Sequence, residues 1–360
     1  RDKMPDVPPL PDRQWINAPI EQQTGAHKLK VFTYNVLAES YATEEQHPYA
    51  PSHILKWENR KHKVLDEIIK NDADIICLQE VEGRQFEQFF LPKLREKGYD
   101  GIQKLKTRSK TMSDPGSVDG CAIFYRTSKL RMEDKIDIEY QSLAYNLPTG
   151  PGLDRTIRRD NIALFIILQL LPEQQNNNSR HNSKNNNSRR LIICNTHIHW
   201  DPSEADVKLM QVQFMLEEID KACRQRNDTN MPLIIAGDFN SEPSNAVYEL
   251  LKNGNVDSSH KDWNNTNYGT YSKNGCSHRF HLKNCFDGLQ EPEFTNFNGD
   301  FIGVLDYIWY SEDSIRVLGI SKLPTKEEIL TQNSPLPNSN FPSDHIHICT
   351  EFEILPKNRR

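Results

Sequence analysis

Residues 190–198, RLIICNTHI, and residues 232–240, PLIIAGDFN, decide the fold class. Each is a run of β-branched and other apolar residues with the length of a strand, and each ends in polar side chains. Between them, residues 206–221 place their apolar side chains on one face of a helix. A strand, a helix and a second strand in this order are typical of a mixed α/β or α+β structure.

The same pattern recurs along most of the chain. Further runs of strand length lie at residues 28–36, 72–80, 119–126, 161–171, 304–310 and 344–354. No linker interrupts them, so we expect one domain over residues 29–356, preceded by an extended lead-in at residues 1–28. Residues 174–190 are rich in Asn and Ser and contain no apolar side chain. This composition predicts a disordered insertion between two strands.

Composition excludes several classes of protein. The 44 Lys and Arg against 50 Asp and Glu give a net charge of −6, so nucleic-acid binding would need a local groove. Seven scattered cysteines without a CxxC pair argue against a disulfide framework and against a thiolate zinc site. No apolar run reaches the roughly 20 residues of a membrane helix. We therefore expect no membrane contact and a reducing compartment, the cytoplasm or alternatively the nucleus.

Polar side chains of one chemical kind end several of the strand-like runs. In chain order they are Asn35, Glu80, His197, His199, Asp238, Asn240, Asp306, Asp344 and His345. Neighbouring strands place their ends along one rim, where several carboxylates without nearby Lys or Arg repel one another unless a cation is present. Taken singly, Glu80 or Asp306 is as consistent with a structural ion pair as with a metal ligand. Asp344 and His345 could simply cap a strand or a turn.

The ligand types indicate which cation such a rim would hold. Carboxylate, carboxamide and imidazole groups without thiolate favour Mg²⁺ or Mn²⁺ over structural Zn²⁺. A divalent ion can neutralise phosphoryl oxygens and a leaving alkoxide while an aspartate orients or deprotonates the attacking water. The residues therefore predict hydrolysis of a phosphate ester.

Seven short motifs follow one another in a fixed order between residues 28 and 355. They are YNVL, LQEVE, DGCAIFY, THIHWDP, GDFNS, LDYIWY and SDH. Their order resembles the exonuclease-endonuclease-phosphatase superfamily, which includes apurinic endonucleases, deoxyribonuclease I and inositol polyphosphate 5-phosphatases. Longer stretches such as YAPSHILKWENRK, VDGCAIFY and FPSDHI resemble the nuclease domain of CCR4-type poly(A)-specific deadenylases. The resemblance implies a four-layer αββα sandwich that removes adenylate from mRNA tails in the 3'-to-5' direction and releases 5'-AMP.

The resemblance also implies metal-binding roles. Glu80 with Asn35 would bind a first Mg²⁺ ion. Asp306 and His345 would lie around a second ion and the scissile phosphate, with Asp344 orienting the imidazole of His345. Two Mg²⁺ ions are therefore expected, and Mn²⁺ is expected to substitute.

Further roles implied by the resemblance concern the water and the substrate phosphate. Asp238 would position or deprotonate the attacking water, and Asn240 and His197 would donate hydrogen bonds to phosphoryl oxygens. Arg155 and Asn161 match a stretch that lies near the nucleotide phosphate in the family.

Two positions match the adenine grip of the family, Pro202 and Phe301. A base held between an aromatic ring and a proline gains roughly 1 to 3 kcal/mol of stacking. A lone Phe ahead of a strand is more often a core residue, and only the position of Phe301 five residues before Asp306 favours the adenine role. Residues 104–110, KLKTRSK, either line the path of single-stranded poly(A) RNA or form a solvated loop.

Alternatives to a deadenylase stay open at the level of sequence. Branches that resemble nocturnin or the 2',5'-oligoadenylate phosphodiesterase act on other adenylated molecules. A catalytically silent RNA-binding relative should have lost Glu80, Asp238 or His345, and none is missing. Full-length CCR4 proteins carry leucine-rich repeats that dock them to a larger complex, and this sequence has no LxxLxLxxN repeat. Subunits of that complex are expected partners only if such an adaptor is missing from this chain.

Overall fold

Two large sheets carry the apolar runs in the computed structural model, which describes residues 7–20, 27–148, 150–172 and 189–356. The first sheet has the order β1-β16-β17-β2-β3-β5-β4 and the second the order β12-β15-β9-β8-β7-β6. The first consists of β1 (Trp15–Asn17), β2 (Lys28–Asn35), β3 (Ile75–Glu82), β4 (Tyr99–Leu105), β5 (Asp119–Arg126), β16 (Ile315–Ser321) and β17 (Ile348–Ile354). The second consists of β6 (Leu130–Glu139), β7 (Ile162–Leu170), β8 (Arg190–His197), β9 (Leu233–Asp238), β12 (Leu282–Asn284) and β15 (Asp306–Ser311).

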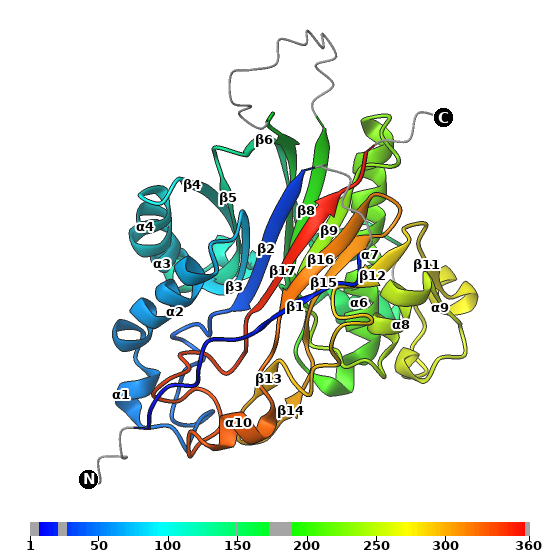
Figure 1. Cartoon of the computed structure of the whole chain (residues 1–360). Coiled ribbons are helices and arrows are strands. Elements are labelled where there is room, and N and C mark those ends of the chain that lie inside the picture. Colours follow the sequence, from blue (N-terminus) through cyan, green and yellow to red (C-terminus); the bar gives the residue numbers. More distant parts are fainter. Residues whose placement is uncertain (1–6, 21–26, 149, 173–188, 357–360) are drawn as a thin grey trace, which may run out of the picture.

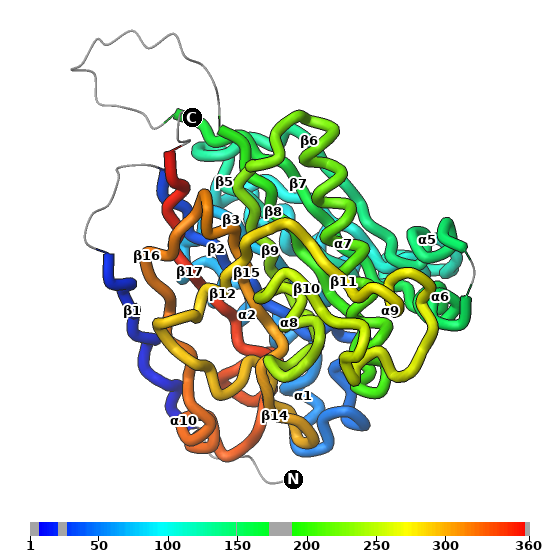
Figure 2. The backbone as a smooth tube through the Cα atoms, turned by 90° about the vertical axis from the view of Figure 1, so that its right-hand side faces the viewer, coloured from blue at the N-terminus to red at the C-terminus, as the bar shows by residue number. Residues whose placement is uncertain are grey.

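Helices cover the outer faces of both sheets, which gives four layers (Figure 1, Figure 2). The first sheet is covered by α2 (Trp57–Asn71), α3 (Gly83–Gln85), the π-helix η1 (Phe86–Phe90) and α4 (Leu91–Arg95). The second sheet is covered by α5 (Tyr140–Tyr145), α6 (Pro151–Ile157), α7 (Ala205–Gln225), α8 (Ala246–Asn253) and α9 (Thr270–Asn274). The short helices α1 (Ser52–Leu55) and α10 (Lys326–Leu330) lie near the lower end of the molecule in Figure 1. The predicted mixed α/β sandwich is confirmed.

Three apolar layers hold these four structural layers together. Side chains such as Val31, Ile166 and Ile234 pack between the two sheets. The outer layers pack the first sheet against α2 and the second sheet against α7. Because successive residues of a strand point to opposite faces, β8 places Ile193 in the central layer and Ile192 in an outer one.

Two parallel pairs fix where the strands end. β2 and β3 are parallel and are connected through α2, while β8 and β9 are parallel and are connected through α7. β15 then pairs antiparallel with β9, so that β15 begins where β9 ends. The polar ends of these strands therefore lie at one end of the sandwich, as the alternating pattern predicted.

The remaining boundaries refine the sequence-based picture. Within the predicted lead-in, Trp15–Asn17 form the edge strand β1 against β16, and residues 1–6 and 21–26 lie outside the described residues. Most of the predicted insertion, residues 174–188, also lies outside them, and its last residue, Arg190, already belongs to β8. All seven cysteines are buried free thiols. Among the described residues, no helix is both long and apolar enough to cross a membrane.

A buried amide links the two sheets. Asn195 of β8 is fully buried and donates hydrogen bonds to the carbonyls of Leu78 on β3 and Ala122 on β5, both at 2.9 Å. Its own Oδ1 accepts a 2.8 Å bond from Gln79 Nε2. Since most side chains between the sheets are apolar, this small polar network fixes their relative position at the end near the polar rim.

We expect Asn195→Ala to lower the free energy of unfolding by about 2 kcal/mol, because it removes two buried hydrogen bonds to carbonyls and one of the three bonds of Gln79 Nε2, which keeps Thr33 Oγ1 and the Cys77 carbonyl. Urea unfolding followed by circular dichroism measures this loss. Asn253→Ala, at an exposed position at the end of α8, is the control and should change stability by less than about 0.5 kcal/mol. A loss below about 1 kcal/mol for Asn195→Ala would show that the amide does not hold the sheets together.

Candidate active site at the rim of the two sheets

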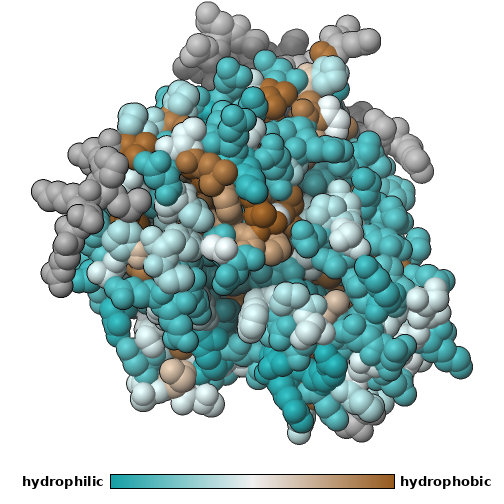
Figure 3. Space-filling view, turned by 90° about the horizontal axis from the view of Figure 1, so that it is seen from below, coloured by the Kyte–Doolittle hydropathy of each residue, from teal (hydrophilic) through white to brown (hydrophobic). Residues whose placement is uncertain are grey.

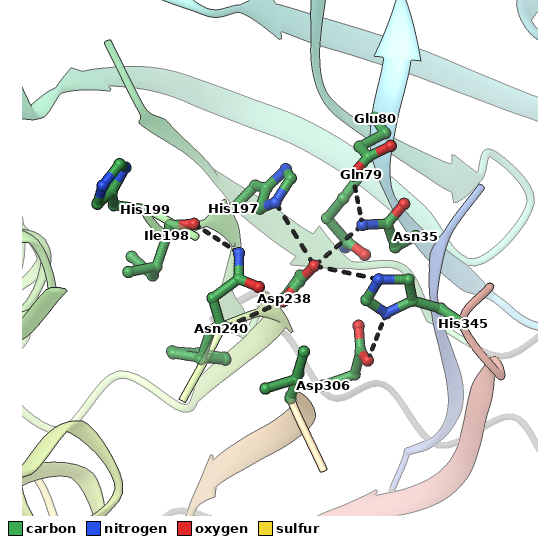
Figure 4. A network of polar contacts seen from close by, with 12 residues as sticks. Asn35, Gln79, Glu80, His197, Ile198, His199, Asp238, Asn240, Asp306 and His345 are labelled. Carbon is green, nitrogen blue, oxygen red and sulfur yellow. Dashed lines mark hydrogen bonds and ion pairs between the residues drawn. The ribbon is translucent and has the colours of Figure 1, made fainter. Parts of the chain in front are cut away.

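Seven of the polar side chains singled out in the sequence converge on one rim (Figure 4), five from strands and two, Asn240 and His345, from the segments after β9 and before β17. Asn35 and Glu80 come from β2 and β3 of the first sheet, and His197, Asp238 and Asp306 come from β8, β9 and β15 of the second. Figure 3 views the molecule from this end, where the surface is hollowed near its middle. The site therefore combines residues from both sheets.

The centre of the site is a pair of facing carboxylates. Asp238 and Asp306 are direct partners across the antiparallel pair of β9 and β15, and both are buried. Like charges at such positions destabilise a sheet unless something neutralises them. Burial and the neighbouring Asp306 raise the pKa of Asp238.

His345 reaches both carboxylates from the segment before β17. Its Nδ1 lies 2.8 Å from Asp306 Oδ2 and its Nε2 lies 3.6 Å from Asp238 Oδ2. Although burial opposes a charged ring, Asp306 and Asp238 raise the pKa of His345 well above its usual range. The imidazolium therefore offsets part of the negative charge of the pair.

Glu80 occupies a β-bulge. The register of β3 against β5 shifts between Leu78 and Val81, and Glu80 has a φ of 58°, in the left-handed region. This conformation is costly for a residue with a long side chain and turns it out of the regular alternation. Its carboxylate accepts a 2.9 Å bond from the Ala38 backbone N–H. Burial, with smaller contributions from Asp344 and other acids, raises the pKa of Glu80 to about 7.

Asn35 connects Glu80 to the facing pair. Its Nδ2 donates to Glu80 Oε1 at 3.0 Å and to Asp238 Oδ2 at 2.9 Å. Its Oδ1 accepts a 3.0 Å bond from the Leu37 backbone N–H. The amide thus places its N–H groups between carboxylates that belong to different sheets.

His197 and Asn240 flank the other side of Asp238. Burial lowers the pKa of His197 to about 4, so its ring is neutral, with Nε2 at 3.5 Å from Asp238 Oδ2. Its Nδ1 is buried without a hydrogen-bond partner among the described residues. The backbone N–H of Asn240 donates to Asp238 Oδ1 at 3.0 Å, and its Nδ2 donates to the carbonyl of Ile198 at 2.8 Å. These bonds fix the orientation of the Asp238 carboxylate.

The structure corrects the expected role of Asp344. The carboxylate bonded to the His345 ring is that of Asp306, whereas Asp344 Oδ2 lies 3.4 Å from Nε2 of His47. Asp344 lies at a bend just before His345, which forms an isolated bridge with Asn296. His47 itself was missed, because nothing in its local sequence marks it as a site residue.

Arg155 and Asn161 are held by neighbouring protein groups. Arg155 donates to Asp206 at 3.0 Å, and Asn161 donates to the backbone carbonyl of His197 at 3.2 Å. Asn161 therefore supports the end of β8. The expected phosphate contacts of both residues stay predictions.

The two positions expected to grip an adenine lie on exposed turns. Pro202 is exposed and opens the 3-10 helix η4 (Pro202–Glu204). Phe301 is half-buried in the turn between the short strands β13 (Asn296–Phe297) and β14 (Ile302–Gly303). This partial exposure argues against the alternative that Phe301 is an ordinary core residue.

The basic segment at residues 104–110 is neither a free cationic surface nor a solvated loop. Lys106 is buried, and its Nζ lies 2.9 Å from Asp119 Oδ2, which also attracts the half-buried Arg108. The two outer lysines of the segment both pair with Glu139. Although burial opposes ionisation, Lys106 and other cations lower the pKa of Asp119. Sequence reasoning missed these partners because they lie far along the chain.

The donors at the rim fit a divalent cation. Ligand atoms of Asp238, Asp306 and His345 all lie within 4.8 Å of one another. The Glu80 carboxylate lies next to them across the Asn35 amide, whose Nδ2 faces both Glu80 and Asp238. Oxygen and imidazole donors with excess negative charge suit Mg²⁺ or Mn²⁺.

The described residues contain a second group of ligand-type side chains, His199, Asp201 and Glu204. Unlike the rim, this group has an arginine side chain bound to it. Arg159 binds both oxygens of Glu204, at 2.7 and 2.6 Å. The negative charge of Glu204 is therefore already offset.

Comparison with known proteins agrees with this geometry. Residues 32–345 match the family model of the Endonuclease/Exonuclease/phosphatase family. The chain is 37% identical over 352 residues to the CCR4-Not complex 3'-5'-exoribonuclease subunit Ccr4 of Yarrowia lipolytica, covering 90% of this chain and 48% of that protein. It is 36% identical to the CCR4-NOT transcription complex subunit 6-like-A of Xenopus laevis, covering 96% of this chain and 68% of that protein. The chain thus spans about half the length of several curated relatives that it matches.

Solved structures share the fold. ANGEL2, a 2',3'-cyclic phosphatase, superposes with a TM-score of 0.76 at 24% identity, covering 96% of this chain and 99% of that one. The catalytic domain of human nocturnin superposes with a TM-score of 0.64 at 23% identity, covering 95% and 97%. The paired sheets, the acidic rim and these matches together show that the chain belongs to the Endonuclease/Exonuclease/phosphatase family and is similar to CCR4-type exoribonucleases.

Proposed function

We propose that this chain is a Mg²⁺-dependent 3'-5' exoribonuclease that shortens poly(A) tails and releases 5'-AMP. The observation that carries the proposal is the buried pair of Asp238 and Asp306 with His345 between them and Glu80 beside them. The relatives named CCR4 exoribonuclease subunits support the nuclease activity. We further propose that the substrate is single-stranded poly(A) RNA and that the enzyme acts in the cytoplasm or the nucleus, with subunits of a deadenylase complex as partners.

Glu80 and Asn35 would hold a first Mg²⁺ ion, and Asp306 would hold a second, with His345 lying beside that ion and the scissile phosphate. When bound, the ions would neutralise charge on the phosphoryl oxygens and on the leaving 3'-oxygen. Asn35 would then turn its Oδ1 toward an ion, in place of the N–H groups that separate the carboxylates in this structure.

The chain's own residues supply the rest of the reaction. Asp238, with its pKa raised by burial, is suited to accept the proton of the attacking water. The water oxygen bonds to phosphorus, the bond to the 3'-oxygen of the preceding nucleotide breaks, and 5'-AMP leaves. His345 is held at Nδ1 by Asp306, and its Nε2–H, which faces Asp238 at 3.6 Å in this structure, would donate to a phosphoryl oxygen of a bound substrate. One hydrogen of the Asn240 amide bonds to the Ile198 carbonyl, and the other can donate to a phosphoryl oxygen.

Specificity for adenine would come from Pro202 and Phe301. Both are exposed enough to contact a base, and neither contributes a group to the acidic cluster. The remaining substrate contacts that we propose are Arg155 and Asn161, through the phosphate of the terminal nucleotide, together with a donated hydrogen bond from His197.

The direct test incubates the protein with 5'-labelled A-tailed, U-tailed and C-tailed RNAs in Mg²⁺ and follows shortening on a gel. Stepwise shortening of the A-tailed RNA ahead of the others supports the proposal. Parallel reactions contain 2',5'-oligoadenylate and NADPH. Turnover of either with no attack on A-tailed RNA would replace the proposal by a phosphodiesterase or phosphatase of small adenylated molecules.

We expect Glu80→Ala to reduce the rate of hydrolysis by about a hundredfold or more, because the first metal ion loses its carboxylate ligand. Its melting temperature should change little, since alanine is as strained as glutamate in the left-handed conformation and the lost carboxylate was itself costly to bury. Glu96→Ala, at an exposed position after α4, is the control and should keep wild-type activity.

EDTA should abolish hydrolysis by the wild-type protein, and Zn²⁺ should restore it less well than Mg²⁺. Near wild-type rates in purified Glu80→Ala, or in EDTA, would contradict a metal-dependent site at this rim.

We expect Phe301→Ala to raise KM for A-tailed RNA and to lower the ratio of A-tail to U-tail rates, consistent with about 1 to 3 kcal/mol of lost stacking. Residual cleavage should still require Mg²⁺, because the metal ligands are unchanged. The matched control is Phe89→Ala, a half-buried Phe in η1 on the outer face of the first sheet, which should lower stability without changing the ratio. An unchanged ratio with a large stability loss for Phe301→Ala would rule out the adenine grip.

A further inference from the structure

Two aromatic side chains are unusually exposed, and both flank the end of β8. Among the described residues, Tyr145 is 75% and Trp200 is 68% exposed, more than any other large apolar side chain. A single exposed apolar residue is common, but Tyr and Trp are enriched at binding interfaces, where one part of the ring is covered and its polar group stays in contact with water. Both rings belong to segments next to the end of β8, Tyr145 to α5 and Trp200 to the loop that follows the strand.

Tyr145 ends α5, a helix anchored beside the catalytic rim. The first residue of α5, Tyr140, contacts Thr196 Oγ1 at 2.7 Å, and Thr196 immediately precedes His197. In the second sheet β6 is separated from β8 by β7, so the start of α5 at the end of β6 lies roughly 10 Å from β8. The Tyr145 ring lines a shallow hollow together with the polar side chains of Gln141, Ser142 and Asn146 and with Ile157 of α6.

Trp200 is connected to the same hollow by a continuous set of contacts. Its ring lies 6.1 Å from the ring of His199, whose Nε2 is 2.7 Å from Glu204. Glu204 is in turn bound by Arg159, two residues after Ile157. Glu204 ends η4, and the exposed Pro202, two residues after Trp200, opens it.

Arg158 adds a positive charge next to Ile157, which lines the hollow. It follows α6 and is exposed, and it has no side-chain hydrogen bond or ion pair within the described part of the chain. The acidic residues nearest in sequence are offset, since Asp160 pairs with Arg108 and Glu204 pairs with Arg159. Exposed rings beside a free guanidinium are the elements that bind bases and phosphates of a single strand.

We propose that Tyr145, Arg158 and Trp200 form a second nucleotide-binding surface, which holds single-stranded RNA upstream of the terminal nucleotide. This inference rests on the proposed function, because it assumes that the strand's 3' end lies at Asp238. The rings stack on successive bases and Arg158 contacts the intervening phosphate. The amides of Gln141 and Asn146 face the base that enters the hollow.

The test measures binding and turnover separately. Binding of a labelled 20-nucleotide oligoadenylate is followed by fluorescence anisotropy in EDTA, where no cleavage is expected, and turnover of the dinucleotide ApA is followed in Mg²⁺. We expect Tyr145→Ala, Trp200→Ala and Arg158→Glu each to weaken binding of the 20-nucleotide RNA about tenfold. Turnover of ApA should stay within about twofold of wild type, because ApA is too short to reach the second surface.

Two controls separate stacking from general effects. Tyr145→Phe keeps the ring and should bind RNA within about twofold of wild type, whereas Tyr145→Leu keeps apolar bulk without an aromatic face and should bind like Tyr145→Ala. Lys97→Glu makes the same change to negative charge in the exposed turn before β4, at the opposite end of the strands, and should leave binding unchanged.

Each outcome decides the inference. Unchanged RNA binding in the three variants, or no RNA binding by the wild-type protein, would overturn it and leave a protein partner as the occupant of this surface. An equal loss of ApA turnover would show that the residues only support the catalytic rim. If the wild-type protein binds RNA through this surface but does not shorten A-tailed RNA, the proposed function falls while the binding surface stands.

Discussion

The facing carboxylates of Asp238 and Asp306 impose the constraint on which the rest of the site depends. Two unit charges about 4 Å apart repel each other by about 4 kcal/mol at an effective dielectric constant of 20. The protein surrounds the pair with groups that offset this repulsion, His345 between the two carboxylates and Asn35 on the side of the other sheet. Each group comes from a different part of the chain, so the site exists only when both sheets are complete.

Stability and function oppose each other at this rim. Glu80 is held in a left-handed bulge and buried enough to raise its pKa to about 7, and both features cost folding free energy. This cost is offset by interactions elsewhere, in the apolar layer between the sheets and at the Asn195 amide, which hold the two sheets together. A bound cation would relieve part of the cost, which links metal binding to the stability of the fold.

Much of the fold and the identity of the central residues could be predicted from the sequence, because both follow from local pattern. Apolar runs with polar ends identify the strands, and parallel pairs bring Asn35, His197 and Asp238 to one rim. The bulge at Glu80, the contact of Asp344 with His47, and the burial of Lys106 against Asp119 depend on register and on distant partners. Such pairings leave no local signal in the sequence. For this reason Asp344 was expected to orient the imidazole of His345, whereas in the structure Asp306 does so.

Every role proposed for this rim requires that the carboxylate cluster binds divalent cations. Titration of the metal-free protein with Mn²⁺, followed by electron paramagnetic resonance, measures that binding without any substrate. We expect saturable Mn²⁺ binding by the wild-type protein, displacement by excess Mg²⁺, and loss of binding sites in Asp306→Asn and in Glu80→Gln. Wild-type protein that binds no Mn²⁺, or variants that bind as many ions as the wild type, would contradict the account.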